Sequence, residues 1–420
     1  MSVQRKEVIA LDEQDPLKHF KSQFLFPKTI EGHDYLYFCG NSLGLQAQKT
    51  RGYVDQELLD WAQFGVTGHH NAKNPWYKYH EFLTDAMANI IGAKPIETVI
   101  MNTLTVNLHL MMVSFYRPTK QRFKILIEHS TFPSDRYAVE SQIRFHGFDP
   151  KEALLILKPE PGEDYISKET IQSIFEKEGD TIALALIGSV NYYTGQAYPI
   201  PFITKLAHES GCKIGFDLAH GAGNLFLNLH EDGPDFATWC GYKYLNGGPG
   251  SLAGCFVHER HAYNYTIPKF AGWWGHNKMT RFKMEPLYES MPGAEGWQLS
   301  NPPILPMACL LASLELFKEA GMKSLRKKSL ELGNLLFTLL DELKDPNISI
   351  ITPKSEDERG CQISIKIKNA DKKIFHRISK NGVIADWREP DVIRIAPVPL
   401  YNTFTDVFEF MEILKNAIHD

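Results

Sequence analysis

The stretch that decides the fold is KIGFDLAHGAGNLF, residues 213–226, followed closely by FATWCGYKYLNGGPG, residues 236–250. Each begins with a short apolar run typical of a buried strand and ends with one charged side chain beside small residues, Asp217 in the first and Lys243 in the second. In open α/β sheets, ligands bind beyond the carboxyl ends of the strands. The pair therefore has two interpretations: a salt bridge at the rim of a sheet, or two groups that hold one small cofactor.

Short apolar runs of the same kind recur along the N-terminal two thirds of the chain, and segments of helical length separate them. The runs at residues 98–102, 123–128 and 181–190 are bounded by turn residues, whereas residues 105–116 and 200–211 have a helical pattern. Buried strands that alternate with helices are typical of a mostly parallel sheet covered by helices. The sequence therefore predicts an α/β fold for this part of the chain.

The C-terminal third has a different pattern, which begins with a long amphipathic stretch over residues 305–343. Strand-like runs follow at residues 348–352, 361–367, 383–389 and 392–398, with a helical segment at 371–382 and a closing helix from about residue 402. This mixture predicts a small α+β domain, joined by the N-terminal segment. The chain is accordingly divided into an N-terminal segment associated with the small domain (1–60), a large domain (61–305) and a small C-terminal α+β domain (306–420).

Composition and charge narrow the possible partners. The chain has 420 residues, 43% of them hydrophobic, and a formal net charge of −5, so it lacks the basic excess of a nucleic-acid surface. We expect a small-molecule substrate, no nucleic acid and no membrane. The N-terminus lacks the apolar core of a signal peptide, and the six cysteines have no CxxC spacing, which favours reduced thiols and a cytoplasmic location.

Two further motifs have simple interpretations. HERH, residues 258–261, offers His258 and His261 to a metal, but no third ligand has suitable spacing, so we interpret both as solvated loop histidines and expect no metal. NGGPG, residues 246–250, is not a nucleotide-binding loop, because no Gly-Lys-Ser/Thr follows the glycines.

Asp217 and Lys243 have complementary chemistry. An amine at such a position can attack a carbonyl and form a Schiff base, and a nearby carboxylate keeps a heterocyclic nitrogen protonated. Together they are the binding signature of pyridoxal phosphate. His220 suits either a contact with that cofactor or an ordinary place in the core. Thr105 opens a helix-like segment, where its hydroxyl and the free N–H groups suit either a phosphate or a simple N-cap.

With these residues in place, the chain resembles the kynureninase family of fold-type-I pyridoxal-phosphate enzymes. The motifs that carry the resemblance run in order over most of the chain: YFCGNSLGLQ (37–46), NTLTVNLHL (102–110), FPSD (132–135), YTGQ (193–196), FDLAH (216–220), GYKYLNGGPG (241–250), GWWGH (272–276), TRFKM (280–284), SNPPI (300–304) and RIAPVPLYN (394–402). The resemblance implies a mostly parallel seven-stranded sheet, pyridoxal 5'-phosphate as cofactor and a homodimer with shared active sites. The implied reaction is hydrolysis of kynurenine or 3-hydroxykynurenine at the Cβ–Cγ bond, giving alanine and anthranilate or 3-hydroxyanthranilate, in tryptophan catabolism and NAD biosynthesis.

The resemblance also assigns roles at the cofactor. Eight residues of one subunit are implied: Lys243 as the Schiff-base lysine, Asp217 at the pyridinium nitrogen, Phe132 stacked on the ring, Leu104, Thr105 and Tyr242 at the phosphate, and Asp135 and His220 beside the cofactor. Lys243 and Tyr242 would also transfer protons, which calls for pKa values moved toward neutrality. Trp273 and Asn301 would reach the cofactor from the neighbouring subunit.

The substrate is assigned four residues by the same resemblance. Arg394 would clamp the substrate carboxylate, for which the forked guanidinium is well shaped. His69, Ser300 and Asn301 match positions that contact the aromatic ring and its hydroxyl. Asn301 is similar to the form that favours 3-hydroxykynurenine; the alternative is that it only satisfies backbone groups at a proline-rich turn.

One position departs from the family pattern, and other functions stay open. Relatives read Ser-Gly where this chain has Gly188-Ser189, so a contact from that hydroxyl is lost unless Ser189 replaces it from a shifted position. A cysteine desulfurase needs a mobile reactive cysteine, and Cys361, the one candidate in the small domain, opens a strand. An aminotransferase and a catalytically silent binding protein are the remaining alternatives, although the presence of Lys243 and Asp217 argues against the second.

Overall fold

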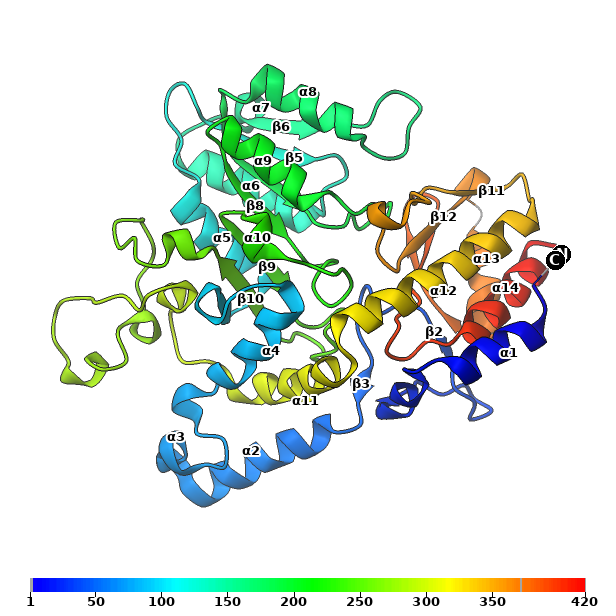
Figure 1. Ribbon diagram of the computed structural model, residues 1–420, viewed down its shortest axis with the longest axis horizontal. Coiled ribbons are helices and arrows are strands. Elements are labelled where there is room, and N and C mark those ends of the chain that lie inside the picture. Colours follow the sequence, from blue (N-terminus) through cyan, green and yellow to red (C-terminus); the bar gives the residue numbers. More distant parts are fainter. Residues whose placement is uncertain (1–2, 371, 420) are drawn as a thin grey trace.

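The computed structural model describes residues 3–370 and 372–419 of the chain. Two sheets dominate it, a large one in the left half of Figure 1 and a smaller one at the right. The large sheet has seven strands: β4 (Thr98–Ile100), β5 (Lys124–Glu128), β6 (Leu154–Leu157), β7 (Ile182–Gly188), β8 (Lys213–Asp217), β9 (Phe236–Cys240) and β10 (Ala253–Val257). Their order is β4-β10-β9-β8-β7-β5-β6, and β10 alone among these seven runs opposite to the other six. The predicted mostly parallel, seven-stranded sheet is confirmed.

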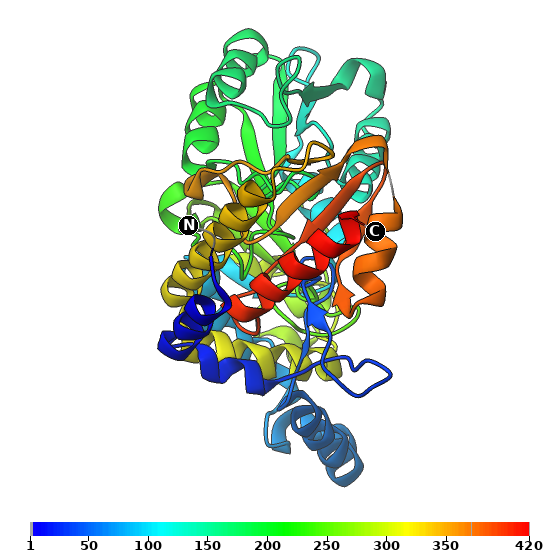
Figure 2. The same cartoon turned by 90° about the vertical axis from the view of Figure 1, so that its right-hand side faces the viewer.

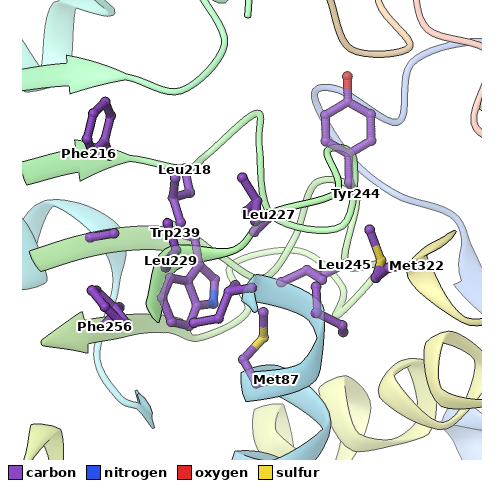
Figure 3. Close-up of a cluster of buried hydrophobic side chains, with 14 of the residues drawn as sticks. Met87, Phe216, Leu218, Leu227, Leu229, Trp239, Tyr244, Leu245, Phe256 and Met322 are labelled. Carbon is purple, nitrogen blue, oxygen red and sulfur yellow. The ribbon is translucent and has the colours of Figure 1, made fainter. Parts of the chain in front are cut away.

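Helices cover both faces of this sheet. Consecutive residues of β5 show this, because Leu126 belongs to one hydrophobic core whereas Ile125 and Ile127 belong to another. The helices around the sheet are α2 (Thr50–Phe64), α3 (Gly68–Asn71), α4 (Glu81–Ile91), α5 (Leu104–Phe115), α6 (Pro133–Phe145), α7 (Pro150–Ala153), α8 (Lys168–Glu178), α9 (Ile200–Glu209), α10 (Leu229–Asp232) and α11 (Ile304–Ala320). Figure 3 shows part of the first core, where Phe216, Trp239 and Phe256 extend from strands of the sheet and Met87 comes from α4.

The C-terminal part forms a second sheet with its own core. Its strands are β11 (Ile348–Ile350), β12 (Ile363–Ile367), β14 (Asp386–Arg388) and β15 (Val392–Ile395), paired antiparallel in the order β11-β12-β15-β14. The helices α12 (Met322–Leu343), α13 (Lys372–Lys380) and α14 (Phe404–His419) lie beside it (Figure 1). The amphipathic stretch predicted over residues 305–343 is interrupted at Gly321, whose φ of 73° separates α11 from α12.

The N-terminal segment contacts both cores, since Val8 and Phe38 lie in the core of the second sheet whereas Phe20, Phe24 and Ala47 lie in the first core. It contains α1 (Arg5–Gln14), β1 (Phe24–Leu25), β2 (Leu36–Tyr37) and β3 (Gln46–Ala47), and β1 pairs with β3. Strand β2 pairs in parallel with β13 (Val383–Ile384). Lys328 of α12 and Asp15 form a buried ion pair of 2.7 Å. Helix α11, in contrast, contributes to the first core, and the division at residues 60 and 305 stays a prediction.

The HERH histidines are not solvated, contrary to the prediction. His261 is buried, and its Nε2 lies 2.8 Å from Oδ1 of Asp235, which also bonds His208, Lys213 and the N–H of Ile214. His258 is half-buried, and its Nδ1 accepts a hydrogen bond from the N–H of Arg260. His258 comes close to Glu97 and His230, but its two ring nitrogens already bond Arg260 and the carbonyl of His230. The hydrogen bonds of His258 and His261 therefore hold the turn after β10 in place.

Candidate active site

A cavity of about 160 Å³, open on one side to solvent, lies at the carboxyl ends of the parallel strands. It is lined by Thr103, Leu104, Thr105, Glu128, Phe132, Ser134, Asp135, Gly188, Val190, Tyr192, Asp217, Ala219, His220, Tyr242 and Lys243. All eight residues predicted to meet the cofactor from one subunit are in this set. The position is the one where open α/β sheets bind their ligands.

Two carboxyl groups form one wall of the cavity. Asp217 is the last residue of β8, and its Oδ1 accepts a hydrogen bond of 2.7 Å from the N–H of Ala219. Asp135 comes from the first turn of α6, and its buried Oδ1 has no hydrogen-bond partner. Burial and the neighbouring Asp217 raise the pKa of Asp135 well above its ordinary value. A cationic nitrogen beside this wall would give the carboxyl groups of Asp217 and Asp135 a partner of opposite charge.

Lys243 lies opposite, in the turn that follows β9. Its Nζ is 3.1 Å from Nε2 of His220 and 5.8 Å from the centre of the Phe132 ring. Neither Asp217 nor Lys243, both within the described chain, has the other as an ion-pair partner, so the interpretation as a rim salt bridge is wrong. Burial, and then the charge of Lys243, lower the pKa of His220 well below its ordinary value, which keeps this histidine neutral beside the lysine.

The start of α5 forms the end of the cavity suited to an anion. The helix begins at Leu104, and the N-cap position belongs to Thr103, so Thr105 is not the N-cap. The hydroxyl of Thr105 instead lies 2.9 Å from that of Ser134. The N–H groups of the first turn have no acceptor within the helix, and the helix dipole favours negative charge there. This end of the cavity therefore suits a phosphate.

Tyr242 contradicts one expectation. Its ring lies beside Lys243, with Nζ 5.9 Å from the ring centre. Burial, and then the neighbouring Cys240, raise the pKa of Tyr242 rather than moving it toward neutrality. The hydroxyl is therefore protonated, so it can donate a proton or a hydrogen bond but cannot serve as a base.

Gly188 and Ser189 lie differently with respect to the cavity. Gly188 lines the cavity, whereas Ser189 does not, and its buried hydroxyl lies against Gly221 without a hydrogen-bond partner. Ser189 therefore does not replace the expected serine contact from a shifted position.

Arg394 of β15 is buried beside the cavity rather than open to it. Its Nε donates to Oδ1 of Asp386 at 2.6 Å, and its terminal nitrogens donate to the carbonyl of Tyr192, to Ser42 and to Asp386. Although burial opposes it, the guanidinium lowers the pKa of Asp386. Tyr192 connects Arg394 to the cavity, since its ring meets that of Phe132 at 5.2 Å.

Besides Arg394, four predicted residues lie outside this cavity. Trp273, Ser300 and Asn301 are exposed, and His69 is half-buried against Trp76. They come from neighbouring segments, since Trp273 contacts Trp274, whose ring contacts Tyr77, the neighbour of Trp76, and whose backbone N–H bonds the carbonyl of Leu299 just before Ser300. The single chain therefore does not bring these four residues to its own cofactor cavity.

The sequence interpretation missed several groups at the site. Glu128 ends an apolar strand, as Asp217 does, and this pattern could have identified it. Ser134 stands inside the quoted FPSD motif but was not assigned a role. Asp386 and Ser42 reach Arg394 from distant parts of the chain, and no local sequence signal indicates that contact.

The chemistry of the residues that line the cavity fits pyridoxal phosphate. Asp217 and the unpartnered oxygen of Asp135 suit a pyridinium nitrogen. The half-exposed ring of Phe132 suits an aromatic face. Lys243 suits the aldehyde, and the start of α5 suits the phosphate.

Comparisons with known proteins agree with this fit. A cysteine desulfurase, CsdA of Escherichia coli, shares the fold with a TM-score of 0.76 at 13% identity, over 96% of this chain and 98% of that chain. A C-DES variant with glycine covalently linked to its PLP cofactor gives a TM-score of 0.77 at 15% identity, over 91% of this chain and 96% of that chain. The fold and the cavity thus define a fold-type-I pyridoxal-phosphate enzyme.

Sequence comparison then identifies the family. The kynureninase of Myxococcus xanthus is 55% identical over 96% of this chain and 95% of that protein. The kynureninase of Koribacter versatilis is 52% identical over the same shares. A family model described as the kynureninase C-terminal domain matches residues 325–414. The chain belongs to the kynureninase family.

The structure also bears on the desulfurase alternative. Likeness to desulfurases at 13% to 16% identity concerns the fold alone. Cys361 is fully buried, and burial raises the pKa of its thiol to about 12. A reactive cysteine needs access and a lowered pKa, so Cys361 is unsuited to that chemistry.

Proposed function

We propose that the cavity is the active site at which this chain hydrolyses the Cβ–Cγ bond of kynurenine or 3-hydroxykynurenine. The products are alanine and anthranilate or 3-hydroxyanthranilate. The observation that supports this most strongly is that all eight residues expected at the cofactor from one subunit line one cavity. Family membership supplies the reaction, and the cavity supplies the candidate residues.

In this proposal the cavity holds the cofactor at three points. Asp217, with Asp135 behind it, binds the ring nitrogen, and Phe132 covers the ring. Lys243 bonds the aldehyde carbon. Leu104 and Thr105, at the start of α5, bind the phosphate together with Tyr242.

The residues then divide the proton transfers of the reaction. The chemistry that bound pyridoxal phosphate supplies is a sink for the negative charge that develops at the α- and β-carbons of the substrate. Lys243, once displaced by the amine of the substrate, takes the proton from the α-carbon. Water adds to the γ-carbonyl, the Cβ–Cγ bond breaks to release anthranilate or 3-hydroxyanthranilate, and Lys243 returns its proton to the α-carbon to complete alanine. Tyr242 is the proton donor for Cβ, because its raised pKa keeps the hydroxyl protonated.

Arg394 binds the substrate carboxylate in this proposal. In the structure, Asp386 and Ser42 hold its guanidinium in a fixed orientation. Because Nε and Nη2 already donate to Asp386, the substrate carboxylate would take the place of part of this bonding when it binds.

We further propose a homodimer in which His69, Trp273, Ser300 and Asn301 act on the neighbouring subunit's site. Large apolar side chains are exposed on α2, just after it and around Trp273, namely Leu59, Trp61, Val66, Trp273, Phe282, Met284 and Leu287. Helix α2 projects from the body at the bottom of Figure 2. Large exposed apolar side chains favour a protein interface, and a twofold dimer would carry those of each subunit toward its partner.

The proposed location is the cytoplasm. All six cysteines are unpaired in the structure, as expected in a reducing compartment. Within residues 3–370 and 372–419, every helix is too short or too polar to cross a bilayer.

The function is tested by incubating the purified protein with pyridoxal phosphate and each substrate. Anthranilate-type fluorescence and alanine should both appear. Lys243→Ala should abolish turnover and the visible absorbance of the lysine-bound cofactor while circular dichroism stays unchanged. Formation of a keto acid in place of alanine would favour an aminotransferase, and near-normal turnover by Lys243→Ala would contradict the assignment of the lysine.

A further inference from the structure

Glu128 lines the cavity but has no part in the proposed reaction. It is the last residue of β5, and its side chain is buried. Its Oε2 accepts a hydrogen bond of 3.2 Å from the N–H of Gly188, the last residue of the neighbouring strand β7. Gly188 is in turn the register partner of Asp217 on β8. Three adjacent strands therefore end side by side in Glu128, Gly188 and Asp217.

The absence of a side chain at Gly188 makes room for this carboxyl group. A Cβ at position 188 would lie 2.9 Å from Oε1 of Glu128, closer than real Cβ contacts. A residue with a side chain there would push the carboxyl group away. This gives a physical reason for the glycine at the position where the chain departs from the family pattern.

Glu128 adds a third carboxyl group to Asp135 and Asp217. Lys243 is the one Lys or Arg side chain that lines the same cavity. Burial, and in addition the charge of Asp217, raise the pKa of Glu128 to about 7, although the N–H of Gly188 and the hydroxyl of Thr131 oppose the shift. Glu128 adds to the upward pKa shift of Asp135, and to that of Tyr198, which faces it from the segment after β7. Three buried carboxyl groups cannot all be ionised beside one cation.

We propose that Glu128, held in place by Gly188, is a positioning residue that sets the charge of the acid cluster behind Asp217 and thereby the strength with which Asp217 binds the ring nitrogen of the cofactor. This inference rests on the proposed cofactor site. Ionised Glu128 strengthens the hold on a pyridinium cation, and protonated Glu128 weakens it.

The first test needs no cofactor. The pKa of Glu128 is raised above its ordinary value of 4.5, so the folded chain keeps a proton that the unfolded chain releases. The stability from this proton is complete below about pH 4.5 and is lost as the pH rises through about 7. Glu128→Gln keeps an acceptor for the N–H of Gly188 but cannot titrate. The fall in Tm of the cofactor-free protein between pH 5.5 and pH 8 should therefore be smaller in the variant, by roughly 1–3 °C. An identical fall in both proteins would contradict the inference.

The second test measures the affinity of the cofactor-free protein for pyridoxal phosphate at pH 6 and at pH 8. Glu128→Gln should weaken binding on the order of tenfold at pH 8, where the wild-type carboxyl group is ionised, and by less than about twofold at pH 6. Gly188→Ala, which displaces the carboxyl group, should produce the same pH-dependent loss and covers the case in which Glu128→Gln fails to fold. A matched control is Glu97→Gln, a buried glutamate that does not line the cavity; its affinity should equal that of the wild type at both pH values.

The outcomes separate the inference from the function it rests on. An equal loss at both pH values would reduce Glu128 to a packing role and overturn the inference. Unchanged affinity at both pH values would overturn it as well. Failure of the wild-type protein to bind pyridoxal phosphate at all would overturn the proposed function, whatever the first test shows for Glu128.

Discussion

At the residue scale, the site places neutral and charged groups in an order that physical chemistry explains. His220 is buried and neutral, so it contacts Lys243 without adding a second positive charge to the cavity. Asp217 keeps one fixed hydrogen bond from Ala219, and the rest of its carboxylate remains for a ligand. The charged side chains of the cavity are thus those that we expect to contact the cofactor.

Asn301 offers a test of substrate choice at this scale. Asn301→Thr shortens the side chain and removes its amide, which should lower kcat/KM for 3-hydroxykynurenine relative to kynurenine by about 10-fold or more, since a polar site loses most when its partner group disappears. The measurement is kcat/KM for both substrates before and after the change. Leu305→Ala, at another exposed position nearby, is the control that should leave the ratio unchanged. If Asn301→Thr left the ratio of the two kcat/KM values unchanged, Asn301 would only satisfy backbone groups at its turn.

Much of the site could be predicted from the sequence because charged residues at the ends of apolar strands are readable locally. Asp217 and Lys243 were found in this way, and Glu128 has the same signature. The partners of Arg394 could not be predicted, because Ser42 and Asp386 approach it only after the N-terminal segment has packed on the second sheet. The pKa of Tyr242 was predicted in the wrong direction, since burial is not visible in a motif.

At the element scale, the break between α11 and α12 depends on one backbone conformation. Gly321 ends one helix and precedes the next with a φ of 73°, a region that other residues rarely adopt. The sequence pattern is amphipathic on both sides of this glycine, so periodicity alone could not locate the break. Strands β6 and β10 escaped individual prediction for related reasons: β6 has only four residues, and β10 follows a glycine-rich turn.

Two glycines of this region form a matched pair for a stability test. Gly321→Ala should lower the free energy of unfolding by about 1 kcal/mol, because the added methyl group meets no neighbour but the backbone conformation becomes strained. Gly333→Ala, inside α12 with its nearest contacts at 3.8 Å, should raise it by about 0.5–1 kcal/mol. Urea denaturation measures both. Equal effects of the two substitutions would refute the conformational explanation.

Asp235 connects the starts of β8 and β9 and should control acid stability. Burial acts to raise its pKa, but the hydrogen bonds of His208 and His261 and the charge of Lys213 outweigh burial and hold the pKa well below its usual range. The resulting stability is present above the unfolded pKa of about 4 and is lost as the pH falls below it.

Asp235→Asn should therefore lower the free energy of unfolding by about 3–5 kcal/mol at pH 7, with a difference from the wild type that narrows below about pH 4. Denaturation at several pH values measures this. The control Asp180→Asn, at a fully exposed position, should stay within about 0.5 kcal/mol of the wild type. A difference that widened on acidification would show that Asp235 is not held ionised by its partners.

At the scale of the whole molecule, two cores are tied together by contacts between distant segments. The buried pair of Asp15 and Lys328 fixes the N-terminal segment to α12, and β2 extends from that segment to β13. The sequence indicated two sheets and their order along the chain. It could not show that α11 belongs to the first core, because a helix with apolar residues on several sides can pack on either neighbour.

The proposed dimer makes a prediction about mixed subunits. Lys243→Ala and Trp273→Ala should each be nearly inactive alone, but mixed and reassociated subunits should recover roughly a quarter of wild-type activity, because half of the dimers are mixed and each mixed dimer has one intact site. Activity and sedimentation of the mixture measure this. Two Lys243→Ala preparations mixed in the same way are the control and should stay inactive. No recovery from a dimeric mixture would place Trp273 in its own subunit's site.

The reversed strand β10 has a consequence for the timescale of local motion. Because β9 and β10 pair antiparallel, the turn that carries Lys243 is anchored in the sheet at both ends, and the N–H of Gly44 also bonds the carbonyl of Tyr242. The turn therefore has no free end from which it can fray. The amide hydrogens of its buried residues 244–247 should exchange with solvent more slowly than those of an exposed loop, so we expect Lys243 to keep a fixed position.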